Sequence, residues 1–175
     1  MAISEESTGS WTGTDNGSGG APREIAVTVT VPAAADSIVI VYGGWSNNQA
    51  TDIDIDGNTG IVTRHVNAEN GVDQVASIFS IEASHANFPS GSTTFTTVSS
   101  GATGDQRRMG VAFYSGVHQS SPLRDSGTQT GSIDAASITL SSTQTGDYCI
   151  GALATYTGDG AALAGDETEI HFLRS

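Results

Sequence analysis

The chain contains 175 residues, with 19 acidic residues against six arginines and no lysine, and its formal net charge is −13. A surface that binds phosphate groups needs clustered Lys and Arg, so nucleic acid and anionic membranes are poor partners for this chain. Glycine (22 residues), serine and threonine are abundant, whereas only 14% of the residues are charged. Because Thr, Val and Ile favour strands and glycine serves turns, this composition predicts an all-β protein.

Residues 1–23 are polar and rich in Gly, Ser and Thr, with Trp11 as their one aromatic side chain. Such a segment cannot pack a core by itself, so we expect an extended N-terminal arm that is either flexible or forms an edge-wrapping strand, with Trp11 as a candidate docking anchor. Residues 24–175 are expected to form a single domain, since no interior boundary is visible. The start of the chain lacks the basic and apolar regions of a signal peptide, and no apolar run reaches transmembrane length.

Apolar and polar residues alternate through the first predicted strands of this domain. The strand over 24–31 ends at Pro32, and its inward face comprises Ile25, Val27, Val29 and Val31. Residues 37–45 are apolar on both faces, which predicts a central strand covered on each side. Residues 52–56 alternate again, and a turn at 56–58 leads into a strand over 61–67.

The second half of the domain continues this pattern of short strands and turns. Residues 72–82 fit a strand better than a helix, and a strand over 93–99 places Phe95 inward. A strand over 107–115 breaks at Ser115-Gly116, and residues 120–131 form a polar loop. Three more strands are predicted over 133–140, 147–155 and 169–173. Nine to ten short antiparallel strands of this kind predict a β-sandwich of the jelly-roll type.

Few residues point to chemistry. The run Asp52-Ile53-Asp54-Ile55-Asp56-Gly57 is similar to the start of a calcium loop, which makes Asp52, Asp54 and Asp56 candidate Ca²⁺ ligands. However, Thr63 occupies the twelfth position, where such a loop needs a bidentate Glu. Strand alternation explains the three aspartates without a metal, so the metal-free interpretation is favoured and no cofactor is expected.

No catalytic arrangement is visible in the sequence. The four histidines lack paired metal-ligand spacing, and neither a nucleophile elbow nor a phosphate-binding glycine loop occurs. The single cysteine, Cys149, falls in a predicted strand and is expected to be a buried thiol. We therefore expect a protein that is not an enzyme. Trp45, at the end of a predicted strand, is the best aromatic candidate for stacking on a carbohydrate.

Several segments together are similar to a β-sandwich domain of tailed-phage structural proteins, of the decoration and fibre type, and of bacterial surface proteins. They are the alternating strand 25–32, the strand 36–41 (DSIVIV), the strand and corner over 112–123 (S-G-V-x-Q-x-x-P-L) and the T-G-D strand over 145–154. The resemblance covers residues 24–155. This chain ends sooner after the T-G-D strand than such domains do, which could leave an unpaired sheet edge for a neighbour to cover.

The resemblance implies a virion protein without enzymatic activity, made in the host cytoplasm without a signal peptide and located on the capsid surface. We expect a capsid decoration or cement protein that forms a homo-oligomer, with a trimer favoured, and that binds the major capsid protein or another virion protein. Its contact residues would be Trp11, Arg23, Arg107, Arg108 and Arg124. One alternative is a carbohydrate- or receptor-binding module of a fibre or cell surface that uses Trp45, Asp52, Asp54 and Asp56. Another is a tail-tube or tail-tip subunit.

Overall fold

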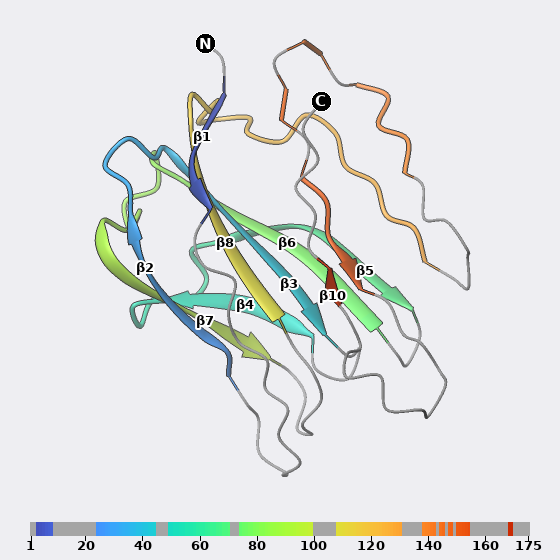
Figure 1. Ribbon diagram of the computed structural model, residues 1–175, viewed down its shortest axis with the longest axis horizontal. Helices are drawn as coiled ribbons and strands as arrows, with labels where there is room; N and C mark the ends of the chain where they lie inside the picture. The colour runs from blue at the N-terminus through green and yellow to red at the C-terminus, as the bar shows by residue number, and fades with distance from the viewer. Residues whose placement is uncertain are drawn as a thin grey trace.

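A computed structural model describes residues 3–8, 24–44, 49–70, 74–99, 108–130, 138–142, 144–145, 147–148, 150–154 and 168–169 of this chain. The described residues contain strands and no helix, as the composition predicts. Eight antiparallel strands form two sheets, slightly fewer than the nine to ten strands expected, and two further strands of two residues pair with each other (Figure 1).

The strand order defines a five-stranded sheet, β1-β8-β3-β6-β5, and a three-stranded sheet, β2-β7-β4. The bounds of these eight strands are β1 Ser4–Thr8, β2 Ala26–Val31, β3 Ser37–Gly44, β4 Ala50–Ile55, β5 Thr63–Asn70, β6 Gln74–Glu82, β7 Gly91–Ser99 and β8 Arg108–Ser115. The two short strands are β9 Leu153–Ala154 and β10 Thr168–Glu169. The chain changes sheet at every connection between β1 and β8 except the one from β5 to β6. This repeated crossing is the winding of a jelly roll, so the predicted β-sandwich is confirmed.

The main core lies between the two sheets. Alternation places Val27 and Val31 of β2, and Ile53 and Ile55 of β4, against the inner face of the larger sheet. The predicted inward position of Phe95 on β7 is also confirmed, since its side chain is fully buried. From β3, β6 and β8 the inner face receives aliphatic and aromatic side chains, namely Ile38, Ile40, Tyr42, Val75, Phe79, Ile81, Met109, Val111 and Phe113.

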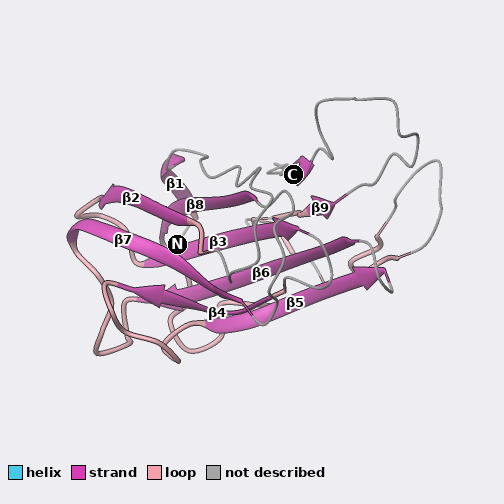
Figure 2. Cartoon of the chain, turned by 90° about the horizontal axis from the view of Figure 1, so that it is seen from below, coloured by secondary structure: helices cyan, strands magenta, loops and turns pink. Residues whose placement is uncertain are grey.

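The outer face of the five-stranded sheet is covered as well. All eight residues of β3 are buried, as expected for a central strand with apolar side chains on both faces. Val39, Val41, Ala112 and Tyr114 form a second cluster, which packs against Tyr148, Ile150 and Ala152 from the last part of the chain. Figure 2 shows β9 above β3 and β6, with β4 below them.

Where the structure describes them, the predicted strand over 133–140 and most of that over 147–155 are irregular, whereas Glu169 of the predicted strand over 169–173 is paired in β10. Residues 138–142, 144–145, 147–148 and 150–152 are irregular, and only Leu153–Ala154 and Thr168–Glu169 are paired as strands in this region. The other residues of these three predicted strands lie outside the described residues. The error has a physical reason: apolar residues here cover a sheet face that is already complete, and side-chain contacts rather than a ladder hold them.

Part of the predicted N-terminal arm belongs to the sheet. β1 pairs antiparallel with β8, with Ser4 opposite Ser115 and Thr8 opposite Ala112. Residues 9–23 of the predicted arm lie outside the described residues, so its flexibility or docking remains an expectation for them. This agrees with the expectation of an edge-wrapping strand, although the absence of apolar alternation from Ser4–Thr8 left its bounds unpredicted.

Candidate functional site

Two of the four segments that carry the resemblance, 36–41 and 112–123, meet at one corner of the sandwich. The Asp36 carboxylate accepts hydrogen bonds from the backbone N–H groups of Gly116 (2.8 Å) and Val117 (3.2 Å). The Gln119 amide donates to the Asp36 carbonyl oxygen at 3.0 Å and accepts from the Ser84 N–H at 3.0 Å. Gly116 has a φ of 78°, a conformation that a side chain would strain. These residues therefore join the start of β3, the end of β6 and the end of β8, which is a structural role.

The three aspartates of β4 and of the turn that follows it accept hydrogen bonds from backbone amides of that segment and of the neighbouring strand β7. Asp54 accepts from the N–H of Gly57 at 2.7 Å, and Asp56 accepts from the N–H of Thr94 at 2.8 Å. Asp52 accepts from the N–H of Gly60 at 2.5 Å with one oxygen and from that of Ile53 at 2.8 Å with the other. Within the described residues, no group of three His, Cys, Asp or Glu side chains is arranged to hold a metal ion.

Four strands form the edges of the two sheets in the described part of the chain, and three of them share two features. β1, β4 and β5 each contain a β-bulge, at Glu6, Thr51 and His65 respectively. Each also carries charged residues, such as Glu5 on β1 and Asp54 on β4. Bulges and charges are the devices by which sheet edges resist pairing with another chain.

β2 is the edge strand that has neither feature. Its six residues, AVTVTV, are uncharged, and they pair with Gly91–Thr96 of β7 without a register shift. The N–H of Thr97 donates to the carbonyl oxygen of Ile25 at 2.9 Å, so odd-numbered residues here direct their backbone groups toward β7. Because antiparallel strands alternate, the backbone N–H and C=O groups of Ala26, Thr28 and Thr30 point to the opposite side. No strand of the described residues pairs with that side.

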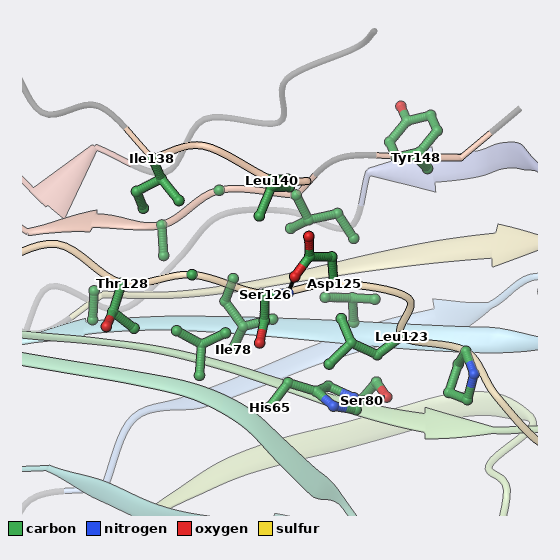
Figure 3. A pocket seen from close by; sticks show the side chains of 18 of the residues that line it. His65, Ile78, Ser80, Leu123, Asp125, Ser126, Thr128, Ile138, Leu140 and Tyr148 are labelled. Carbon is green, nitrogen blue, oxygen red and sulfur yellow. Dashed lines mark hydrogen bonds between the residues drawn. The ribbon is translucent and has the colours of Figure 1, made fainter. Parts of the chain in front are cut away.

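A pocket of about 590 Å³ lies between the outer face of the five-stranded sheet and the irregular segments 122–129, 138–142, 144–145, 147–148 and 150–152 (Figure 3). We call these segments the strap. The floor of the pocket is formed by Val66, Ala68, Ala76 and Ile78 of β5 and β6. The strap contributes Leu123, Ile138 and Leu140 from the other side, and Leu123 and Ile138 remain 44% and 50% exposed. The pocket is therefore mainly apolar and reaches the surface.

One end of the pocket is polar because of the bulge in β5. Arg64 pairs with Phe79 and Val66 pairs with Ile78, so the intervening His65 is an extra residue and lines the pocket together with Val66. The Ser80 hydroxyl donates to the Glu82 carboxylate at 2.5 Å and lies 2.7 Å from Nε2 of His65. A hydroxyl has one proton, so Nε2 of His65 is the donor in the second bond and Nδ1 is left as an acceptor. Burial lowers the pKa of His65 despite the opposing charge of Glu82, which favours this neutral form.

Polar contacts rather than a strand ladder hold the strap. One oxygen of Asp125 accepts from the N–H groups of Ser141 (2.7 Å) and Ser142 (3.0 Å). These backbone donors, Ser142 foremost, lower the pKa of Asp125 below its ordinary range. Arg124 forms an ion pair with Asp147 at 2.8 Å. At the far end, the Tyr148 hydroxyl donates to Glu5 of β1 at 2.6 Å, and its ring lies 4.9 Å from that of Tyr114.

The residues predicted for a site do not come together among those described. Trp11, Arg23, Trp45 and Arg107 lie outside the described residues. Arg108 begins β8 opposite Gly43, and Arg124 is paired within the strap. The carboxylates of Asp52, Asp54 and Asp56 accept hydrogen bonds from backbone amides, as described above. The sequence analysis missed His65, because a bulge in β5 shows only once its register against β6 is known.

Comparison of this chain with models of known families, with curated proteins and with solved structures gives no match. A search of the described residues finds no helix long and apolar enough to cross a membrane.

Proposed function

We propose that this chain is a capsid decoration protein of a tailed-phage virion, a non-enzymatic subunit that binds its neighbours by strand addition at β2. One observation carries the proposal: β2 is the described edge strand that lacks both charge and bulge. An edge of this kind accepts a strand from another chain, and main-chain hydrogen bonds then supply the affinity. The bulges and charges of β1, β4 and β5 hinder pairing with another chain, which leaves β2 as the described edge open to association.

Two further observations support this proposal. Two of the segments that resemble phage structural domains, 36–41 and 112–123, meet at Asp36, so they act together in building the scaffold. The net charge of −13 without lysine keeps subunits apart except where a specific contact exists. Pairing of β2 with a second β2 would give a two-fold dimer, whereas addition of a different segment of the neighbour to β2 is a head-to-tail contact that closes into a ring when the rotation permits. We propose the head-to-tail contact and a trimer. The partner on the virion would be the major capsid protein or another structural protein.

The direction of the β2 backbone gives a sharp test of strand addition. Thr28→Pro removes an N–H group that faces away from β7, so the subunit should keep its fold while losing the neighbour's hydrogen bond. Thr28→Val is the matched control, because it keeps the N–H group and removes only the hydroxyl that bonds Thr94 at 2.8 Å. Light scattering after size exclusion should show a trimer for the original chain and for Thr28→Val, and a monomer for Thr28→Pro.

Two results would overturn the proposal at different levels. A chain that is monomeric at micromolar concentration, or a Thr28→Pro trimer, would exclude assembly through β2. Quantitative mass spectrometry of purified phage particles tests the location, and we expect a copy number comparable to that of the shell protein. A few copies per particle would instead indicate a fibre or tail subunit.

A further inference from the structure

The pocket on the outer face of the five-stranded sheet has no part in strand addition at β2. Its volume of about 590 Å³ falls in the range of roughly 300–1,000 Å³ that is typical of small-molecule sites. An apolar space of this size loses packing contacts when it is empty, and water binds well only where two to four polar partners surround it. The side chains on both walls are mainly aliphatic, so a mainly apolar molecule is the occupant that they fit.

The charges around the pocket restrict its ligand further. Glu82 and Asp125 line the pocket, whereas none of the described arginines does so. A bound carboxylate or phosphate would therefore be desolvated close to two negative charges without a cationic partner among the described residues, which is costly. A cation would also lose its hydration among the mainly aliphatic walls, which offer its N–H groups few acceptors. The lining therefore favours a neutral ligand.

One polar atom can orient such a ligand. Nε2 of His65 donates to the Ser80 hydroxyl, which in turn donates to the Glu82 carboxylate. Nδ1 of His65 therefore carries no proton and can accept a hydrogen bond. A hydroxyl group on the ligand is the complementary donor. We propose that the pocket binds a neutral, mainly apolar small molecule whose hydroxyl group donates a hydrogen bond to Nδ1 of His65. This proposal does not depend on the function proposed above.

Fluorescence titration with Nile red, a neutral apolar dye, tests the site in the full chain at pH 7.5. We expect saturable binding of one dye per chain and displacement by 1-decanol. Methyl decyl ether lacks the hydroxyl donor and should compete roughly five-fold more weakly, the effect of one hydrogen bond. Decanoate, which is anionic, should compete at least about ten-fold more weakly than 1-decanol, since the pocket offers it no counter-charge.

Three variants distinguish this site from other surfaces. Ala68→Phe fills the floor and should abolish dye binding, whereas the matched control Ala34→Phe, in the exposed turn between β2 and β3, should bind as the original chain does. His65→Phe should keep dye binding and remove the preference for 1-decanol over the ether. Circular dichroism checks the fold, and Ala68→Leu, expected to weaken binding, replaces Ala68→Phe if that variant does not fold.

Three outcomes would overturn the proposal. The first is unchanged dye binding by a folded Ala68→Phe or Ala68→Leu variant. The second is a decanoate affinity equal to that of 1-decanol. The third is a His65→Phe variant that prefers 1-decanol over the ether as strongly as the original chain does. Self-association that ends when Ala68 is enlarged would show that a second copy of the chain occupies the pocket, which also contradicts a small-molecule site.

Discussion

The two faces of the five-stranded sheet are built from alternate residues of the same strands, yet they are packed differently. On the inner face, Phe79 and Ile81 of β6 are fully buried against the three-stranded sheet. On the outer face, Ile78 and Ala76 of the same strand face a pocket beneath an irregular strap. Sheet-on-sheet packing fills one face, whereas side-chain contacts from Asp125, Arg124 and Tyr148 hold the cover of the other. The inner face should therefore determine stability, and the outer face should be able to exchange contacts.

The largest expected effect comes from a matched pair of isoleucines on β6. Ile81→Ala removes a side chain that is 1% exposed and should lower the free energy of unfolding by about 3–4 kcal/mol. Ile78→Ala makes the same chemical change beside an existing space and should lower it by only about 1 kcal/mol. Urea denaturation measures both. Equal losses would show that the outer face is packed as tightly as the inner face.

A smaller effect should appear in the dependence of stability on pH. His65 has a lowered pKa in the folded protein because of burial, so the unfolded chain takes up its proton first. Stability should accordingly decline as pH falls below the ordinary histidine value of 6.5 and toward the lower folded pKa. His65→Gln should remove this part of the decline. The melting temperatures of the two proteins between pH 7.5 and 5 provide the test, and parallel curves would contradict it.

The smallest effect on global stability should come from the strap. The Asp125 carboxylate has a lowered pKa in the fold, so its contribution is present above the ordinary value of 3.8 and is lost as pH falls through the folded pKa. Asp125→Asn should loosen the Ser141 and Ser142 amides at neutral pH while leaving β6 unchanged. Amide hydrogen exchange followed by NMR compares these two regions directly. Faster exchange throughout β6 would mean that strap and sheet unfold together.

How much of this arrangement the sequence could predict depends on the kind of interaction. Period-two alternation identified β2 and β4, and continuous apolar character identified β3, because burial alone determines those patterns. β1 was expected only as one of two alternatives, an edge-wrapping strand or a flexible arm, because its polar residues pair through the backbone and have no apolar alternation. The first part of the strap was predicted as a loop over 120–131. Its second part was predicted as strands because its apolar residues follow a similar spacing, although they pack on a finished sheet face.

The pocket could not be predicted, for two reasons. Its floor depends on which residues of β5 and β6 are opposite one another, and its cover depends on a carboxylate, Asp125, that bonds amides 16 and 17 residues away. Neither the strand register nor these long-range hydrogen bonds produce a recognisable pattern in a short stretch of sequence. The aspartates of β4 and its turn are the opposite case, since their local pattern is visible in the sequence and resembles a calcium loop. In the structure, however, they accept hydrogen bonds from backbone amides within and beside the turn.

Because His65 is the unpaired residue of a bulge, its deletion, and not only its substitution, would remove the polar end of the pocket. Arg64 already pairs with Phe79, and Val66 with Ile78, which are neighbours on β6. A chain without His65 would continue the ladder unbroken, with all later pairs of β5 and β6 keeping their partners. A deletion of three nucleotides could thus convert this wall into plain sheet at little cost to the fold, so gain or loss of the histidine is a single evolutionary step.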